Sequence, residues 1–359
     1  MNASVDIYEK TRHERFAKDF GALVARSLTD TQSPIYGALF ETKRPRQCWG
    51  LSGFPMNGAS EAMLFLMAKQ QGYTDHRWFR YDQADMAGGQ VRANERSTTI
   101  KDYNRRVGQT YYPSLFNADQ VKNLPAAEPI TRPTQEEGMA AAQALLDKAR
   151  FPIETGYAKV DVGFDPETTT IRLGAKDTYV TEAFYYADAL KALAQSTAHR
   201  DVMNREVGDG YKARAMEALR VNVAAHMMSE RLGLPFDLGR DIQYTKVWAE
   251  AAQEKPEQVV RAFSDAERIA YELGVYAPRY PKTPLVEKTP EQVERAKEAQ
   301  QQIEQAEETS RAASKKQAVT RTTERQAQRA QQKEREQPTR NTPKPKVRKD
   351  RGPDMAQAM

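Results

Sequence analysis

The sequence has very few of the residues that form disulfides and common metal sites. Its 359 residues include one cysteine, Cys48, and four histidines. A single thiol cannot form an internal disulfide or anchor a thiolate zinc site alone, which fits a reducing compartment and favours Cys48 as a small buried residue. No two histidines lie three to five residues apart, so no helix carries the imidazole pair of a typical zinc motif.

Long apolar runs are missing as well. No stretch approaches the roughly 20 apolar residues of a membrane helix, and the N-terminus MNASVDIYEK lacks the apolar run of a signal peptide. We therefore expect a cytoplasmic chain without membrane contact. Common catalytic signatures are also missing: 50–54 (Gly-Leu-Ser-Gly-Phe) lacks the last glycine of a nucleophile elbow, and no phosphate-binding loop ending in Lys-Ser or Lys-Thr occurs.

The charge is placed unevenly along the chain. From Glu291 to Met359 there are 16 Lys and Arg against 11 Asp and Glu, so the first 290 residues carry 38 charges of each sign. From Glu308 onward the excess is 14 basic against 6 acidic residues. Because this region also has few apolar residues, we predict a charged helical or disordered basic tail over 285–359. Any anion-binding surface in the rest of the chain has to be local.

The remaining sequence predicts an α+β protein of two domains. Apolar residues at helical spacing predict a helix over 5–29. The apolar stretch 62–68 fits a buried helix or a strand, and its Met, Ala and Leu content favours the helix. Short strands and turns around a small helix are expected up to Phe116. We place the first domain at 1–124 and a proline-rich linker at 125–133.

The second domain, predicted over 134–284, is mainly helical. Thr134 and Glu137 form a capping box ahead of its first helix. Alternating apolar residues predict two short strands within 159–173, joined by a turn at 165–167. Three or four helices follow, near 181–198, 207–232, 243–253 and 256–273.

Aromatic and basic residues stand side by side between 75 and 106. From Glu41 to Thr110 there are 11 basic and 7 acidic residues. Aromatic faces beside guanidinium groups suit single-stranded nucleic acid, because unpaired bases stack, at roughly 1–3 kcal/mol each, while phosphates meet the arginines. The alternative is that Trp78, Phe79 and Tyr81 are core residues with solvated arginines around them. A strand over 77–81 would mix aromatic and charged side chains on both faces, which argues against a simple core.

We expect the nucleic-acid contacts to come from one group of aromatic, basic and amide side chains. They are Arg77, Trp78, Arg80, Tyr81, Gln83, Gln90, Arg92, Arg96, Lys101, Arg105 and Arg106.

A family resemblance supports this interpretation. The pattern Gly-Tyr-x3-Arg-Trp-x4-Gln-Ala-x3-Gly-Gly-x-Val-Arg over 72–92 resembles the N-terminal domain of the ArdC-type antirestriction proteins of conjugative plasmids. Phe-Asn-Ala-Asp-Gln at 116–120 is similar to the box that closes that domain. The resemblance implies single-stranded DNA binding, and a similar module occurs in plasmid-borne primases. Asn94 stands where the family usually has a glycine, and asparagine tolerates a positive φ in such a turn.

The resemblance continues to about Tyr271 and implies a second domain of the zincin-like metallopeptidase type. That type carries His-Glu-x-x-His, two imidazoles for a metal ion and a glutamate for its bound water. This chain has Lys-Ala-Leu-Ala-Gln at 191–195 instead, and Asn222 replaces the glutamate of a later helix that supplies the third ligand. The degenerate metal positions are thus Lys191, Ala192, Gln195 and Asn222. An ammonium and two amides do not bind zinc, so we expect no metal, no cofactor and no catalytic residue.

Two functions follow as hypotheses. The first is a single-stranded DNA-binding protein of a mobile element, not an enzyme, acting in antirestriction or in protecting or processing DNA that enters by conjugation. The second is an interaction scaffold whose inactive peptidase cleft and basic tail bind a protein of a conjugation, replication or restriction system. The isolated His226 and His199 are expected to be core or surface residues and not ligands.

Overall fold

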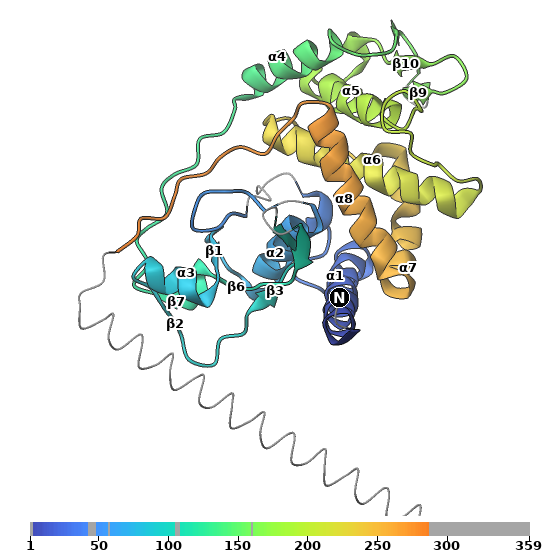
Figure 1. Cartoon of the computed structure of the whole chain (residues 1–359). Helices are drawn as coiled ribbons and strands as arrows, with labels where there is room; N and C mark the ends of the chain where they lie inside the picture. Colours follow the sequence, from blue (N-terminus) through green and yellow to red (C-terminus); the bar gives the residue numbers. More distant parts are fainter. Residues whose placement is uncertain (1–2, 42–47, 57, 105–107, 159–160, 287–359) are drawn as a thin grey trace, which may run out of the picture. The chain divides into compact units, whose positions relative to one another are not determined.

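The computed structural model of the chain describes residues 3–41, 48–56, 58–104, 108–158 and 161–286 (Figure 1). These residues belong to one compact unit. The predicted contacts Arg105 and Arg106 lie outside the described residues, and so does the predicted tail from residue 287 onward.

Two long helices begin the unit, as predicted. Helix α1 spans Ala3–Thr29 and α2 spans Gly58–Gln71, with the short 3-10 helix η1 (Ala38–Phe40) between them. The first nine residues of α2 are all buried, which explains why its apolar side chains are spread all round the helix. The choice of helix over strand for 62–68 is confirmed.

The chain after α2 forms short strands around one small helix. The largest of these sheets has the order β1-β6-β3, and β1 pairs antiparallel with β6, Phe79 lying opposite Phe116. Asn94, in the loop that follows β2, has a φ of 65°, so the predicted left-handed turn is confirmed. The elements are β1 (Trp78–Phe79), α3 (Tyr81–Met86), β2 (Gln90–Val91), β3 (Thr98–Thr99), β4 (Asp102–Asn104), β5 (Gln109–Tyr111), β6 (Ser114–Asn117), η2 (Ala118–Gln120) and β7 (Val121–Lys122).

Helix α4 (Gln135–Leu146) starts at the predicted capping box. The Glu137 amide donates to Thr134 Oγ1 at 3.2 Å, and the Thr134 amide donates to Glu137 Oε2 at 2.7 Å. The preceding residues 125–134 form no helix or strand.

A three-stranded sheet of order β8-β10-β9 follows α4. The antiparallel pair β9 (Gly163–Asp165) and β10 (Thr170–Leu173) confirms the two predicted strands. Strand β8 (Ile153–Thr155) was not predicted and pairs parallel with β10. Because β9 is at the edge of this sheet, one side of it is open to other elements.

Four helices complete the unit and confirm the predicted ones. They are α5 (Glu182–Ser196), α6 (Tyr211–Arg231), α7 (Thr245–Glu254) and α8 (Pro256–Glu272). The 3-10 helix η4 (Lys176–Thr178) precedes α5, and η5 (Gly239–Tyr244) lies between α6 and α7.

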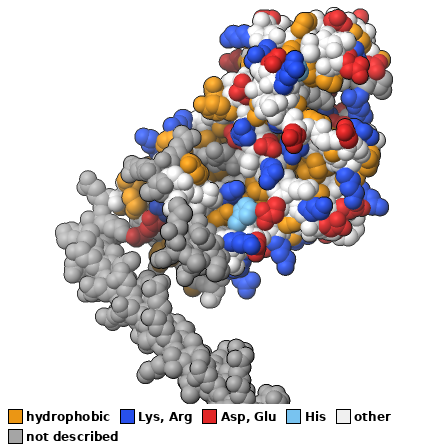
Figure 2. Space-filling view, turned by 45° about the vertical axis from the view of Figure 1, so that its right-hand side comes forward, with side chains coloured by type: hydrophobic (Ala, Val, Ile, Leu, Met, Phe, Trp, Pro, Cys, Tyr) orange, Lys and Arg blue, Asp and Glu red, His pale blue; other side chains and the backbone are white. Residues whose placement is uncertain are grey.

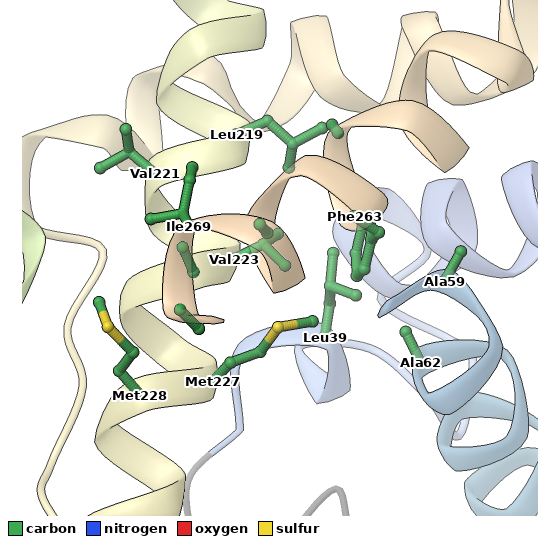
Figure 3. Packing of buried hydrophobic residues seen from close by; sticks show 14 of the residues in the cluster. Leu39, Ala59, Ala62, Leu219, Val221, Val223, Met227, Met228, Phe263 and Ile269 are labelled. Atoms are coloured by element: carbon green, nitrogen blue, oxygen red, sulfur yellow. The ribbon is translucent and has the colours of Figure 1, made fainter. Parts of the chain in front are cut away.

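The apolar core extends across both predicted domains. Helix α1 packs against α7 and α8, and the ring of Phe20 lies edge-on to that of Phe263 with centroids 5.0 Å apart. Figure 3 shows Leu39 and Ala59 beside Phe263 in the same core. A Cβ atom at Gly21 would overlap the carbonyl oxygen of Ala252, so this glycine lets α1 approach α7 closely. The boundaries at 124 and 134 stay a prediction.

After α8 the chain returns along the N-terminal elements without helix or strand. We call residues 275–286 the C-terminal strap; it is orange in Figure 1. The Tyr280 amide donates to the Gly53 carbonyl at 3.0 Å, and the Val286 amide donates to the Met86 carbonyl at 3.0 Å. The strap therefore joins the end of α8 to helix α3.

The surface charge is mixed. Figure 2 shows Lys and Arg interspersed with Asp and Glu over the face in view, as expected from equal numbers of each sign in the first 290 residues. None of the helices in the described part of the chain is long and apolar enough to cross a membrane.

Candidate functional site

Two of the predicted nucleic-acid contacts are buried. Trp78 has no exposed surface and packs edge-on to Tyr73 in the core. Arg77 is also buried, since its Nη2 donates to Asp75 Oδ2 at 2.7 Å and its Nη1 to the Pro125 carbonyl at 2.9 Å. The alternation expected for 77–81 holds in β1, since Trp78 packs in the main core, whereas Phe79 packs in a separate small cluster with Ala84, Ala118 and Val121 and lies beside the Arg77 guanidinium. Neither Arg77 nor Trp78 is available to DNA in this fold.

The N-terminus of α3 carries the exposed part of the predicted group. Tyr81 is 63% exposed, and its ring lies edge-on to Phe116 with centroids 6.5 Å apart. Arg80 is the residue before the helix, and its Nη2 lies 3.0 Å from Asp82 Oδ2. This hydrogen bond raises the pKa of Arg80 and lowers the pKa of Asp82. Gln83 Oε1 accepts from the Arg80 amide at 3.0 Å, so Gln83 stabilises the helix start.

The hairpin of β4 and β5 adds a second aromatic residue beside Arg80. Tyr111 Oη donates to Asp102 Oδ2 at 2.6 Å. The pKa of Tyr111 is raised to about 12, mainly because the hydroxyl is partly buried and secondly because of this hydrogen bond. Arg80 interacts electrostatically with both Tyr111 and Asp102, which places the hairpin next to the start of α3. We call Arg80, Tyr81 and Tyr111 the Tyr81 surface. The sequence analysis missed Tyr111.

Tyr103 is exposed on the other face of the hairpin. Because side chains alternate along a strand, Tyr103 and its partner Thr110 face away from the Asp102–Tyr111 pair. The neighbouring Lys101 is half-buried, and its backbone amide donates to Ser60 Oγ at 3.2 Å.

The remaining predicted residues lie on β2 and the loop after it. Gln90 is exposed opposite Lys122, and Arg92 and Arg96 are exposed on the loop. Arg92 Nε donates to Glu95 Oε1 at 2.9 Å, which offsets one of the two charges. No hydrogen bond or ion pair between described residues joins Arg92 or Arg96 to the Tyr81 surface, although β2 packs against α3. The predicted group is therefore split between two places on the fold.

The degenerate metal positions form a connected polar cluster. Lys191 on α5 donates from Nζ to Asp241 Oδ2 at 2.7 Å and to the Leu238 carbonyl at 3.0 Å. Asn222 on α6 donates from Nδ2 to the same Asp241 oxygen at 2.8 Å and to the Ala218 carbonyl at 2.7 Å. Asp241 lies on η5 and was not predicted. The cluster thus links three elements through one carboxylate.

Gln195 contacts the open edge of β9. Its Oε1 accepts from the Phe164 amide at 3.0 Å, and a Cβ at Gly163 would overlap the Gln195 side chain. Arg240 Nη2 donates to the Val162 carbonyl at 3.4 Å on the same edge. These side chains cover backbone groups with which an added strand would pair.

These residues do not fit a metal ion. The only carboxylate of the cluster, Asp241, is already bonded to an ammonium, Gln195 Oε1 accepts from the Phe164 amide, and Asn222 supplies only one neutral amide oxygen. Within the described residues no group of three His, Cys, Asp or Glu side chains could hold a metal. Zinc sites in proteins take three or four such ligands.

The histidines are packing residues, as expected. His226 is fully buried between Phe40 and Phe236, and its Nε2 lies 3.2 Å from the Glu41 carbonyl. The ring of His199 packs edge-on to Phe151 with centroids 4.9 Å apart.

A cleft of about 790 Å³ lies over the cluster. Strand β9 and helices α5 and α6 contribute its walls, and Gln195, His199 and Asp241 line it. Arg172 and Arg214 also face it; Arg172 pairs with Asp165, whereas no acidic partner of Arg214 lies among the described residues. The cleft is therefore lined by basic, amide and imidazole side chains beside the Asp241 carboxylate.

Comparison with known proteins bears on both halves of the chain. Residues 34–140 match the family model of the N-terminal domain of the anti-restriction factor ArdC, and residues 140–265 match that of a zincin-like metallopeptidase. The predicted resemblance to ArdC-type antirestriction proteins is confirmed. The ArdC-like chain is also similar to solved structures of the antirestriction ArdC protein from the R388 plasmid.

The solved structures agree in fold over most of their length. The Mn(II)-bound ArdC structure has a TM-score of 0.61 and 23% identity, covering 72% of this chain and 96% of that one. The metal-free structure has a TM-score of 0.55 and 22% identity, covering 71% and 96%. At this level of identity, the similarity to the two structures shows a shared fold and no more.

Longer relatives share the same region. Two proteins named DNA primase TraC, from Escherichia coli, are 30% identical to the ArdC-like chain over 232 and 236 residues. The aligned regions cover 55% and 57% of this chain but only 21% and 16% of the relatives. The chain thus spans about a fifth or less of their length.

Proposed function

We propose that the ArdC-like chain binds single-stranded DNA and acts for a mobile element in antirestriction or in protecting or processing DNA that enters by conjugation. The observation that carries the proposal is the Tyr81 surface, where an exposed tyrosine lies beside a guanidinium and a second tyrosine. Every base has a face that can stack on such a ring, so binding needs no particular sequence.

The acidic residues of this surface do not prevent DNA binding. Arg80 is paired with Asp82 at the surface, and exposed pairs of this kind contribute about 0–1 kcal/mol. A phosphate can therefore replace Asp82 at little cost. Asp102 accepts from the hydroxyl of Tyr111 and keeps its negative charge, which interacts with Arg80.

The names of the relatives agree with this proposal. The R388 protein is an antirestriction protein, and the TraC proteins are DNA primases. The match to the family model of the ArdC N-terminal domain covers 34–140, which includes the segment with the Tyr81 surface.

We further propose that the chain has no peptidase activity and uses no metal cofactor. The support is the cluster of Lys191, Asn222 and Asp241, in which an ammonium takes the place of a ligand and occupies the carboxylate. A metallopeptidase needs a bound water on a metal and a glutamate to deprotonate it, and Ala192 stands at the glutamate position.

The second candidate is the interaction scaffold, favoured by the 790 Å³ cleft. A protein partner from a conjugation, replication or restriction system would enter this cleft. Against it, Gln195 and Arg240 cover the edge of β9, so an extended segment cannot add to this strand without displacing them. The scaffold predicts negligible DNA affinity and a partner whose retention falls on Arg214→Glu.

Binding of labelled oligonucleotides over a range of salt concentrations tests the DNA proposal. Tyr81→Ala should weaken single-strand binding about tenfold at every salt concentration, because stacking releases no counterions. Replacing Arg92 and Arg96 together should instead flatten the slope of log affinity against log salt by about 1 to 1.5. Tyr211→Ala is the matched control, since Tyr211 is 49% exposed but lies on α6.

Folding of each variant is checked by its thermal melt. If the folded Tyr81 and arginine variants bind single strands as the parent does, the first domain is not the DNA site and the scaffold takes its place.

A further inference from the structure

Exposed aromatic residues also gather where α8 ends and the C-terminal strap begins. Tyr271 is 67% exposed and Tyr276 is 59% exposed, and their rings meet edge-on with centroids 4.8 Å apart. Phe54 is 53% exposed, and the guanidinium of Arg279 lies 3.2 Å from its ring centroid. These residues take no part in the Tyr81 surface or in the cleft.

The strap is firmly fixed beneath these side chains. Tyr280 stacks on Trp49 at a centroid distance of 4.5 Å, and the Thr283 amide donates to the Leu51 carbonyl at 3.0 Å. Tyr280 and Thr283 are buried. Because the backbone is already ordered, a ligand that binds the exposed side chains loses little free energy in ordering the strap.

The strap carries positive charge only. Arg279 and Lys282 are exposed, and the sequence has no acidic residue from 273 to 286. Among the described residues neither cation has an acidic partner within ion-pair distance. Flat aromatic faces next to unpaired cations match single-stranded nucleic acid, which presents bases and phosphates together.

We propose that the strap and the end of α8 form a second contact for single-stranded DNA, with bases stacking on Tyr271 and Tyr276 and phosphates meeting Arg279, which is held against the Phe54 ring, and Lys282. The proposal rests on the proposed function and extends it. The strap ends on the helix that begins with Tyr81, since the Val286 amide donates to the Met86 carbonyl. One strand can therefore pass from the strap to the Tyr81 surface.

A length series of oligonucleotides separates the two contacts. Oligonucleotides of about 4 to about 16 nucleotides cover the usual range of single-strand site sizes. The Tyr271→Ala/Tyr276→Ala double variant should bind the shortest ones as the parent does and the longest about tenfold more weakly. Tyr211→Ala, which removes an exposed ring that packs against Tyr244 at 5.4 Å, should match the parent at every length.

The cations give a second, independent readout. Arg279→Ala/Lys282→Ala should flatten the salt slope for long oligonucleotides by about 1.4, from about 0.7 per lost phosphate contact, and leave that for short ones unchanged. Both double variants change exposed side chains, so each should melt at the temperature of the parent.

The possible failures are distinct. If Tyr81→Ala loses affinity while both strap variants bind all lengths as the parent does, the strap proposal is overturned and the proposed function stands. If the tyrosine variant loses affinity equally at every length, the strap is not a separate contact and the proposal is again overturned. If neither the strap variants nor Tyr81→Ala changes the affinity for single strands, both the strap proposal and the proposed function fail.

Discussion

At the scale of single residues, Lys191 is the most informative side chain of the second domain. Its ammonium and the Asp241 carboxylate form a mostly buried pair 2.7 Å apart, and Asn222 bonds to the same carboxylate. Removing one partner of a buried pair leaves the other charge without compensation, whereas replacing both by neutral groups is often tolerated. Comparing a single with a double substitution therefore separates the cost of an uncompensated buried charge from the contribution of the pair itself.

We predict that Lys191→Met destabilises the chain by about 3–5 kcal/mol, because the Asp241 carboxylate stays buried without its cation. Adding Asp241→Asn should recover most of the lost stability, since the new amide is neutral and its oxygen still accepts a hydrogen bond from Asn222. Urea unfolding measures both changes. Equal losses in the single and double variants would contradict a compensated pair.

The purified protein should contain no stoichiometric zinc or manganese and cleave no protein, with or without DNA. The reason is that Lys191, Gln195 and Asn222 stand at the three ligand positions that the resemblance identifies. Elemental analysis checks this, and about one ion per chain would refute it.

Sequence reasoning succeeded for residues whose role is local. The capping box of Thr134 and Glu137 and the left-handed turn at Asn94 depend on a few neighbouring residues, so the sequence predicts them. Asp241 could not be found in this way, because it meets Lys191 only after η5 folds against α5 and α6. The burial of Arg77 depends on the carbonyl of Pro125, which is equally remote in the sequence.

At the scale of elements, the long helices were predictable and the short strands only in part. The helices α1 and α5 to α8 repeat their apolar positions over several turns, which gives a strong periodic signal. Strands β9 and β10 were predicted from their alternating apolar residues, whereas the three residues of β8 were not recognised as a strand. Around β1 the strands and the alternation of faces were expected, but the burial of Arg77 and Trp78 was not predicted.

The contact between α1 and α7 gives a prediction at this scale. Gly21→Ala should lower the free energy of unfolding by about 1–3 kcal/mol, because the new methyl group overlaps the Ala252 carbonyl. In an isolated helix the same change would be favourable by about 1 kcal/mol. Chemical denaturation measures the free energy of unfolding and so decides between the two effects. A more stable variant would show that α1 and α7 can move apart without a loss of stability.

At the scale of the whole molecule, the charged sequence beyond the strap is expected to contribute to DNA binding and not to the stability of the folded unit. A chain that ends at residue 287 should keep its melting temperature, since the removed sequence has few apolar residues, and should bind DNA more weakly at low salt. Thermal melts and salt titrations of both chains measure this. A large fall in melting temperature would mean that the removed residues pack on the unit.

The contact of Phe20 with Phe263 also sets the order in which the chain can mature during synthesis. At about 5–20 residues per second, the ribosome needs about 12 to 50 seconds to go from one of these residues to the other. During that interval α1 has an apolar face with no partner. A nascent chain that stops before α7 should therefore be cut readily by proteases within α1 and attract chaperones, whereas one that extends past α8 should be resistant.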